Sequence, residues 1–544
     1  MERKITTTLM LIVCSLMATA QPSIEWQYSL GGTLSDLVDQ GNRVSNTMKQ
    51  TPDGGYIIAA TSYSNDGDVT GHNGPPSAAD NWIVKLDSLG GIEWQHSIGG
   101  TADDFARGVD ITSDGGYIVI GDSFSDDGDV SNHFGSTDTS DAWVVKLDSN
   151  GNIQWDRSYG GSNFDVGSHI EEISGGYIFI GDSRSADGDV SINKGIIDLW
   201  VVKIDTVGNI IWEKSLGGSG SERPDVIRTT SDGGYILSAF TSSNDGDVSN
   251  NIHPPPFWDI WIVKLNSIGN IQWEKTFGGS LIDYGSDVVE TTDGGFILTG
   301  YTNSTDDDMT CNKGMRDNWV AKLDASGNIE WSKCYGGSDN ERGKSIRQTP
   351  DGGYLLGSST ESDNMDVSFN NGEEDCWIVK IDSLGVIEWE QSYGGSDFET
   401  ISNAILTSDG GIAFVGQSLS NDGDVSGHHG SLSEQDVWMV KLSTLTGLSE
   451  LSSNISFFNV APNPAVRETR FNFHLNSASN VLIEILDMQG RQIHALLNTR
   501  LPSGQHYVDW KIDNDLTTGI YIVRLIGEGI PVTKKVLVKN QYNH

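Results

Sequence analysis

The four-residue sequence Asp-Gly-Asp-Val could support metal chemistry, because it places two carboxylates on either side of a glycine. It occurs five times, and its aspartates are Asp66, Asp68, Asp127, Asp129, Asp187, Asp189, Asp245, Asp247, Asp422 and Asp424. Calcium prefers oxygen ligands, so these ten residues are candidate calcium ligands, although the spacing of an EF-hand loop is absent. The alternative is that Asp-Gly only begins a turn, which every copy of a repeat would inherit.

Two further copies have diverged, to "DDDM" at Asp306 and "DNMD" at Asp363. Both keep carboxylates, which favours a cation or simple solvation of charge. Both lose the glycine, which argues against a strict turn requirement.

The acidic turn belongs to a larger unit that is repeated seven times. Three signatures recur in fixed order, exemplified by "IEWQHSIGG" at 92, "SDGGYIVIG" at 113 and "DAWVVKLD" at 141. The tryptophans of the first signature, at 26, 94, 155, 212, 273, 331 and 389, are spaced by 68, 61, 57, 61, 58 and 58 residues. A fixed period of this length indicates a propeller or a solenoid.

Each period contains four short β-patterns. In the second unit these are "ARGVDIT", "YIVIGDS", "AWVVKLDS" and "NIQWDRS", separated by tight turns and one long acidic loop. No stretch shows sustained helical periodicity. Four antiparallel strands repeated seven times predict an all-β chain built on a seven-bladed β-propeller.

The two ends of the repeat array are complementary. The first unit begins with its tryptophan strand at residues 24–29, whereas the last unit ends after "DVWMVKLS" at Asp436 without such a strand. We therefore expect residues 24–29 to supply the missing strand of the last blade, which would close the ring and remove exposed sheet edges.

The repeat pattern resembles the bacterial seven-bladed β-propeller repeat family of extracellular and surface proteins. The resemblance rests on Trp-x-x-x-x-Gly-Gly-x-x-x-Asp, Asp-Gly-Gly-Tyr and Asp-x-Trp-Val-x-Lys-Leu-Asp, and it covers residues 24–443. It implies a fold and a location but no single activity, because propellers host unrelated functions.

Alternation of strand direction predicts that the Asp-Gly-Asp-Val loops and the Gly-Gly-Ser stretches lie on one face. Loops of this length are where binding function is usually placed. Fourteen of the sixteen tryptophans occupy repeated strand positions and are expected in the core. Phe257 and Trp258 lie in the inserted loop "NIHPPPFWDI", where they would suit glycan or peptide contact, with packing over the adjacent loop as the alternative.

Charge and motifs exclude several functions. The 75 acidic and 34 basic residues give a net charge of -41, which argues against nucleic acid as a partner. The sequence has no Gly-x-Ser-x-Gly elbow, no His-Glu-x-x-His and no arginine cluster, and "SDGG" lacks the Thr-Trp of the sialidase-type box. No catalytic residue is assigned, and a non-enzymatic role is favoured.

The N-terminus has the pattern of a secretory signal peptide. Arg3 and Lys4 precede an apolar run at 9–16, and Ala18-Thr19-Ala20 forms a cleavage site after Ala20. No later segment is apolar for long enough to cross a bilayer. The mature chain would keep Cys311, Cys334 and Cys376, an odd and sparse set that excludes a disulfide-dense scaffold.

The last 90 or so residues differ in composition and read as strands of a small β-sandwich. The landmarks "APNPA", "LDMQGRQI", "SGQHYVDW", "LTTGIYIVRL" and "KKVLVK" resemble the type A C-terminal sorting domain of proteins exported by type IX secretion in Bacteroidetes-type bacteria. The resemblance implies recognition by an outer-membrane translocon; a generic adhesive sandwich is the alternative. The motif residues are Pro462, Asn463, Pro464, Asp487, Gly490, Gly504, Gly519, Tyr521, Lys534 and Lys535.

Together these features predict a signal peptide at 1–20, a propeller at 21–447, a linker at 448–458 and a sorting domain at 459–544. We expect a secreted or cell-surface propeller with a binding, adhesion or scaffold role toward an extracellular glycan or protein, with calcium as a candidate cofactor. The alternatives are a secreted glycan-degrading propeller enzyme and a structural surface-layer component.

Overall fold

The computed structural model describes residues 21–38, 46–249, 251, 257–431, 433–444, 455–461, 465, 467–475, 478–486, 491–512, 516, 519–526 and 532–538. The chain separates into two compact units, one of them spanning 21–444 and the other containing the C-terminal region from 445 onward. Among the described residues no helix is long and apolar enough to cross a membrane. The expected signal peptide, with its cleavage site at Ala20, lies outside the described residues.

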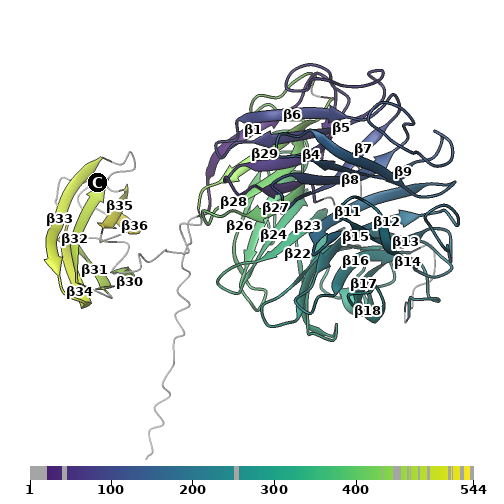
Figure 1. The fold of residues 1–544 in the computed structure, drawn as a ribbon. Coiled ribbons are helices and arrows are strands. Elements are labelled where there is room, and N and C mark those ends of the chain that lie inside the picture. Colours follow the sequence, from purple (N-terminus) through teal and green to yellow (C-terminus); the bar gives the residue numbers. More distant parts are fainter. Residues whose placement is uncertain are drawn as a thin grey trace, which may run out of the picture. The chain divides into compact units, whose positions relative to one another are not determined.

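The described strands of residues 21–444 form seven antiparallel sheets, here called S1 to S7 in chain order. Each has four main strands, here called a, b, c and d in chain order, except that the strand Ile24–Leu30 is strand d of S7; S1 has a short fifth strand, β3. Figure 1 shows the sheets arranged around a common centre, a propeller-like fold.

S1 consists of β2 (Asp36–Leu37), β3 (Met48–Gln50), β4 (Tyr56–Ser62), β5 (Asp80–Leu86) and β6 (Ile92–Ile98), and S2 of β7 (Asp104–Ile111), β8 (Tyr117–Ser123), β9 (Asp141–Leu147) and β10 (Ile153–Tyr159). S3 consists of β11 (Asp165–Ile173), β12 (Gly176–Ser183), β13 (Asp198–Asp205) and β14 (Ile210–Leu216). S4 consists of β15 (Glu222–Thr229), β16 (Tyr235–Thr241), β17 (Asp259–Leu265) and β18 (Ile271–Phe277).

The remaining three sheets follow the same order. They consist of β19 (Asp283–Glu290), β20 (Phe296–Thr302), β21 (Asp317–Leu323) and β22 (Ile329–Tyr335); β23 (Glu341–Gln348), β24 (Tyr354–Thr360), β25 (Asp375–Ile381) and β26 (Ile387–Tyr393); and β27 (Glu399–Leu406), β28 (Ile412–Ser418) and β29 (Asp436–Leu442) with β1 (Ile24–Leu30). The one helical element among the described residues is the single 3-10 turn η1 (Asp307–Met309).

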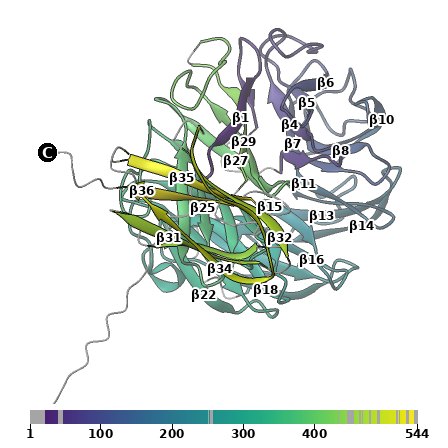
Figure 2. The same cartoon turned by 90° about the vertical axis from the view of Figure 1, so that its left-hand side faces the viewer.

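The strand β1 completes S7. It pairs antiparallel with β29, with Ser29 opposite Trp438 and Gln27 opposite Val440. Figures 1 and 2 show β1 beside β29, although the two lie more than 400 residues apart in the sequence. The first described strand and the last strand of the repeats therefore share one sheet, in which β29 is paired on both sides and β1 is the edge strand.

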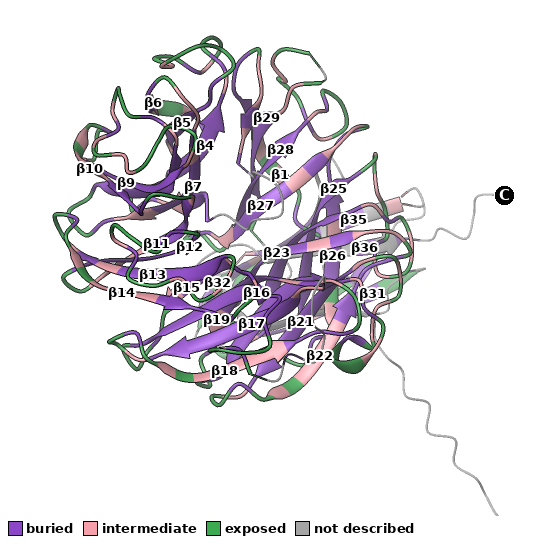
Figure 3. Cartoon of the chain, turned by 90° about the vertical axis from the view of Figure 1, so that its right-hand side faces the viewer, coloured by how far each residue is buried: buried purple, intermediate pink, exposed green. Residues whose placement is uncertain are grey.

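The core of this unit lies between neighbouring sheets. The tryptophan of strand c is fully buried in every sheet, at Trp82, Trp143, Trp200, Trp261, Trp319, Trp377 and Trp438. One apolar cluster joins Val84 and Leu86 of S1 to Val415 and Met439 of S7, so the sheets are held together by side-chain packing. Figure 3 shows buried strands and exposed connecting loops. The expectation that the repeated tryptophans belong to the core is confirmed for strand c.

One disulfide joins Cys311, in the loop after β20, to Cys334 on β22. The sequence did not predict this pair, because two cysteines 23 residues apart carry no pairing signal by themselves. Cys376 is buried and free.

The C-terminal unit contains two sheets. Its strands are β30 (Ile455–Ala461), β31 (Glu468–Leu475) and β34 (Gly504–Lys511) in one sheet, and β33 (Gln492–Leu501), β32 (Ser479–Leu486), β35 (Gly519–Ile526) and β36 (Val532–Val538) in the other. A core that includes Phe471, Phe473, Ile483 and Trp510 contains residues of both sheets, as expected for a small β-sandwich.

Candidate functional site

The acidic loops and the Gly-Gly connectors meet at one end of the sheets, here called the loop face. An Asp-Gly-Asp-Val segment follows strand b, and a Gly-Gly connector follows strand d and leads into the next sheet. In S2 the backbone N–H of Thr101, in the connector, donates to Asp127 Oδ1 at 2.7 Å, and the Thr101 hydroxyl donates to Asp127 Oδ2 at 2.9 Å. The expectation that both sets of loops share a face is therefore confirmed. The opposite end, which carries the tight turns, is the turn face.

The Asp-Gly-Asp-Val segment is a turn that fastens this connector. The backbone N–H of Asp129 donates to the Gly99 carbonyl at 2.9 Å, and the Asp129 carboxylate accepts from the Gly99 N–H at 3.2 Å. Gly128 has a φ of +66°, and a Cβ there would lie 2.4 Å from the Gly99 carbonyl oxygen. Glycine suits this position because it adopts a positive φ without strain and leaves room for the close approach of the connector.

The same fastening recurs in all five copies. The first aspartate accepts a backbone hydrogen bond from the third residue of the connector: Thr33 to Asp66, Thr101 to Asp127, Ser162 to Asp187, Ser219 to Asp245 and Ser396 to Asp422. The second aspartates, Asp68, Asp129, Asp189, Asp247 and Asp424, donate their backbone N–H to the first glycine of the connector.

The two diverged copies keep this turn. Ser280 donates to Asp306, and Ser338 donates to Asn364 in place of an aspartate. Asp307 and Met365 occupy the glycine position with φ of 51° and 60°. The inference that loss of glycine argues against a strict turn requirement was therefore wrong, because a left-handed conformation is retained at a steric cost.

The calcium interpretation receives no preformed site. Among the described residues, no group of three or more His, Cys, Asp or Glu side chains is placed to hold a metal ion. The ten aspartates act as hydrogen-bond partners of the connectors in the structure, and calcium binding by them remains a prediction.

A second set of carboxyl groups lies beneath the connectors, where strand c of one sheet meets strand a of the next. We call each such place a joint. In the joint between S1 and S2, the backbone N–H of Asp104 donates to the carbonyl of Ala79 at 2.7 Å, which brings Asp104 beside Asp80. The seven pairs are Asp80 and Asp104, Asp141 and Asp165, Asp198 and Glu222, Asp259 and Asp283, Asp317 and Glu341, Asp375 and Glu399, and Asp436 and Asp36. All fourteen are buried.

The two members of a joint differ in their hydrogen bonds. Asp104 Oδ2 accepts from the Gly100 N–H at 2.7 Å and from the Ser125 hydroxyl at 2.9 Å. Asp80 Oδ2 accepts from the backbone N–H of Asn73. Oδ1 of Asp80 and Oδ1 of Asp104 are both buried without a hydrogen-bond partner. Burial raises the pKa of Asp80 to about 7 and the pKa of Asp104 to about 7.

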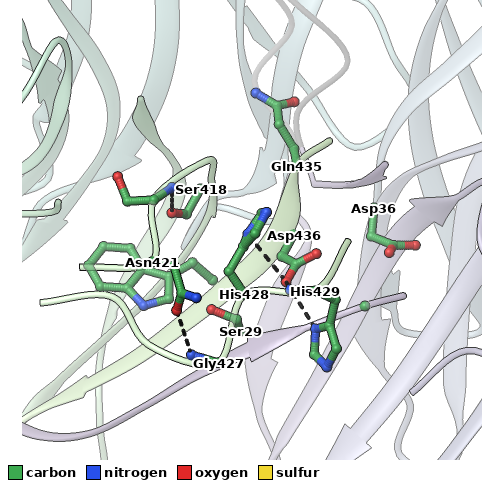
Figure 4. A network of polar contacts seen from close by, with 12 residues as sticks. Ser29, Asp36, Ser418, Asn421, Gly427, His428, His429, Gln435 and Asp436 are labelled. Atoms are coloured by element: carbon green, nitrogen blue, oxygen red, sulfur yellow. Dashed lines mark hydrogen bonds and ion pairs between the residues drawn. The ribbon is translucent and has the colours of Figure 1, made fainter. Parts of the chain in front are cut away.

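Three joints also contain a histidine. His72, His133 and His428 place Nδ1 at 3.4, 3.2 and 3.5 Å from an oxygen of Asp80, Asp141 and Asp436. In the joint between S7 and S1 a second ring, His429, lies 3.0 Å from the same Asp436 oxygen (Figure 4). These three joints are consecutive around the ring, because S7 is followed by S1 and S2. In S3, S5 and S6 asparagines replace the histidines, at Asn193, Asn312 and Asn370.

The turn face pairs its carboxylates with lysines. Lys264, at the other end of strand c from Asp259, has Nζ 2.9 Å from Asp232 and 3.1 Å from the Leu265 carbonyl. Hydrogen bonds from the Thr230 hydroxyl and from Lys264 hold the pKa of Asp232 at about 2. Corresponding pairs are Lys85 with Asp53, Lys146 with Asp114, Lys322 with Asp293, Lys380 with Asp351 and Lys441 with Asp409.

Polar side chains of strand a link successive repeats. Arg228 of S4 and Arg347 of S6 both bind Asp287 of S5. Burial alone would raise the pKa of Asp287, but the two guanidinium groups lower it to about 2. This network was not predicted from the sequence, in which no arginine cluster is visible, because Arg228, Asp287 and Arg347 lie about 60 residues apart. Their common signal is one strand position in successive repeats.

The inserted loop places its aromatic residues against the sheet. Trp258 is half-buried, and its ring packs edge-on against Phe240 with centroids 5.2 Å apart. Its carbonyl accepts from the Asp283 N–H at 2.7 Å, the same backbone bond that Ala79 makes elsewhere. Phe257 is also half-buried. A ligand-binding role for either residue remains a prediction.

The predicted motif residues of the C-terminal unit are only partly described. Pro462, Asn463, Pro464, Asp487 and Gly490 lie outside the described residues. Gly504 and Gly519 begin β34 and β35, and Lys534 and Lys535 lie on β36. Tyr521 is buried, with its ring centroid 6.1 Å from that of Trp510.

Comparisons with solved structures found similarities at low sequence identity. A chain from a crystal structure of BBS1N in complex with ARL6DN is 8% identical, with a TM-score of 0.41 over 78% of this chain and 98% of that one. A mutant of Synechocystis apocarotenoid oxygenase (ACO) is 10% identical, with a TM-score of 0.34 over 69% and 94%. Likenesses at this level carry no argument about activity.

Two sequence comparisons also found matches. The regulatory protein FlaEY of Caulobacter vibrioides is 23% identical over 396 residues, which are 66% of this chain and only 41% of that protein. Residues 459–539 match the family model described as secretion system C-terminal sorting domain. The C-terminal unit of this all-β, propeller-like chain is therefore a sorting domain of the type IX secretion system.

Proposed function

We propose that the chain is a secreted or surface-displayed seven-bladed β-propeller whose loop face binds an extracellular ligand, in an adhesion or scaffold role. In this proposal residues 1–20 are a cleaved signal peptide, 21–447 the propeller, 448–458 a linker and 459–544 the sorting domain. The type IX export machinery is its partner during secretion, and the match of residues 459–539 to sorting domains supports this step.

One observation carries the binding role. The repeated acids of the loop face are hydrogen-bonded to the connectors or buried in joints, whereas non-repeated apolar side chains at the loop tips are exposed. Ile192 and Ile196, in the loop after β12, are 51% and 67% exposed; Met315, after β20, is 63% exposed; and Phe369, after β24, is 55% exposed. Exposed apolar groups contribute nothing to the fold at these tips and are suited to burial against a partner.

The binding role is tested with a matched pair of variants of the full chain. One variant carries Ile192→Ser, Ile196→Ser, Met315→Ser and Phe369→Ser on the loop face. The control carries Leu89→Ser, Val207→Ser, Ile268→Ser and Leu384→Ser, which replace equally exposed apolar residues on the turn face. Both are applied to glycan arrays and to intact bacterial cells, in calcium and in chelator.

We expect the loop-face variant to lose at least about tenfold in binding and the control to retain it, because loss of apolar contacts worth about 1.4 kcal/mol already produces that factor. Equal binding by both variants would contradict the assignment to the loop face. Binding that disappears in chelator would support calcium as a cofactor.

A further inference from the structure

Each of the seven joints places two acidic side chains close together in the protein interior. Each contains two carboxyl groups, both buried, contributed by neighbouring sheets. Two ionised carboxylates in one buried place repel each other and lose their hydration. Something must remove one of the two negative charges while the joint is closed.

The clearest sign is an oxygen atom that lacks a partner. Oδ1 of the strand c aspartate is buried without a hydrogen bond in six joints, at Asp80, Asp141, Asp198, Asp317, Asp375 and Asp436. These residues are at most 1% exposed. An unpartnered buried oxygen costs about 1–3 kcal/mol, so its recurrence in joint after joint indicates a bound positive charge rather than an accident of packing.

The unpartnered oxygen and an oxygen of the second carboxyl group lie beside the same glycine. In the joint between S6 and S7, a Cβ on Gly394 would lie 2.2 Å from Asp375 Oδ1 and 2.7 Å from Glu399 Oε2. In the joint between S1 and S2, a Cβ on Gly99 would lie 2.8 Å from Asp80 Oδ1 and 2.6 Å from Asp104 Oδ2. In six of the seven connectors the first glycine thus covers oxygens of both carboxyl groups, and its missing side chain makes this approach possible.

A metal ion fits the joints poorly. No described group of three or more His, Cys, Asp or Glu residues is placed to hold one. Calcium takes six to eight oxygen ligands, whereas a joint offers only the oxygens of two carboxyl groups, some of which already accept hydrogen bonds. A proton needs only one oxygen.

Other charged groups face the joints and differ among them. The joint of Asp375 and Glu399 faces Asp424, the Cys376 thiol and Glu374, and the carboxylate of Glu374 is held by Arg342. The joint of Asp80 and Asp104 faces His72, Asp103 and Asp129, and the joint of Asp141 and Asp165 faces His133, Asp182 and Asp189. Lys194 and Asp247 face the joint of Asp198; Asp307 and Asp308 face that of Asp259; and Lys313 and Asp366 face that of Asp317. The joint of Asp436 and Asp36 faces His428, His429, Glu434 and Asp68.

We propose that each joint retains one proton on its pair of carboxyl groups while the sheets are in contact, and that loss of this proton weakens the contact. The contacts between neighbouring sheets are then more stable in mild acid and less stable as the medium becomes alkaline. This device is independent of the ligand proposed above.

The direction follows from linkage. Burial raises the pKa of Asp375 to about 7, whereas an unfolded aspartate titrates near 3.9. The folded state therefore binds more protons between these values, and stability falls as the pH rises through about 7. Glu222 and Glu341 shift in the same direction because of burial, with a raised pKa.

The test uses thermal unfolding of the full chain in EDTA, followed by tryptophan fluorescence, from about pH 5 to about pH 8.5. Fifteen of the sixteen tryptophans lie in residues 21–444, so the signal reports that unit. The parent chain is compared with Asp375→Asn, which removes the titration from a joint without histidine. The control is Asp363→Asn, which makes the same charge change at an exposed residue of the loop face.

We expect the midpoint of the parent chain to fall by about 10 °C over this range. Asp375→Asn is expected to raise the midpoint by about 3 °C at the alkaline end and to change it little at the acid end, and the control to change it at neither. A midpoint that stays level or rises with pH would overturn the proposal, as would an Asp375→Asn variant destabilised equally at every pH. Restoration of the alkaline midpoint by calcium, abolished in Asp375→Asn, would also overturn it and assign the joints to a metal.

Discussion

The two ends of strand c place an aspartate and a lysine in opposite electrostatic situations. At the loop face, Asp259 is buried beside Asp283, and burial raises its pKa to about 8. At the turn face, Lys264 binds Asp232, and the pKa of that aspartate falls to about 2. One seven-residue strand thus carries, at one end, a carboxyl group that resists ionisation and, near the other end, a lysine that holds the carboxyl group of Asp232 ionised. The formal net charge of -41 counts every acidic residue as ionised. The difference between the two faces shows that the surroundings of each carboxyl group decide whether it carries this charge.

The largest expected effect comes from two glycines, Gly99 at the loop face and Gly115 at the turn face, which differ in how crowded they are. A Cβ at Gly99 would meet carboxylate oxygens of both members of its joint, whereas a Cβ at Gly115 would meet nothing within 4 Å. We expect Gly99→Ala to lower the free energy of unfolding by about 3 kcal/mol through overpacking. Gly115→Ala should cost about 1 kcal/mol, because its φ of +84° disfavours any side chain. Denaturant titration of both variants measures the difference, and equal losses would remove the contrast between the two faces.

The next effect concerns the lysine at the turn face. Lys264→Met keeps the apolar stem but removes the group that binds Asp232 and the Leu265 carbonyl. We expect a loss of about 2 kcal/mol, because the carbonyl stays buried without a donor. Lys275→Met, at a half-buried lysine whose hydrogen bond is to Asn328, should cost less than about 0.5 kcal/mol. A pH-independent change of the same size in both variants would show that the pairing at the turn face does not stabilise the unit.

The smallest effect is a gain. Met365 holds a left-handed conformation with a φ of 60° at a position where five other copies have glycine. We expect Met365→Gly to raise the free energy of unfolding by about 1 kcal/mol, since the strain disappears while the turn remains. The control is Gly128→Met, which should be destabilising because its Cβ would also strike the connector. A loss of stability in Met365→Gly would mean that the side chain contributes more than the backbone strain costs.

Much of the fold was accessible from the sequence. The period of about 60 residues gave four strands per unit, and strand positions of the tryptophans indicated a core between sheets. The complementary ends of the array led to the expectation for residues 24–29, and β1 indeed pairs with β29. The C-terminal landmarks were specific enough to indicate a sorting domain, which the family match confirms.

The chemistry of the loop face was less accessible. Asp127 looked like a metal ligand because its sequence neighbours are Gly128 and Asp129, but its contact is Thr101, 26 residues earlier. The partner of Asp80 is Asp104, on the next sheet, and only the folded ring brings them together. Both members stand in the repeated signatures, at the start of "DxWxVK" and after "GGSxx". The sequence contained the residues of each joint, yet it could not show which carboxyl groups become buried together.

The most direct test of this account is the number of protons released when the full chain unfolds. The chain is transferred to guanidinium at about pH 6, in EDTA, and proton release is followed with an indicator dye. Burial raises the pKa of Asp80, Asp104 and Asp375 to about 7, whereas an unfolded aspartate titrates near 3.9. We therefore predict release of several protons per chain, reduced by about one in Asp375→Asn. Proton uptake, or no change, would contradict the claim that each joint retains a proton on its pair of carboxyl groups in the folded state.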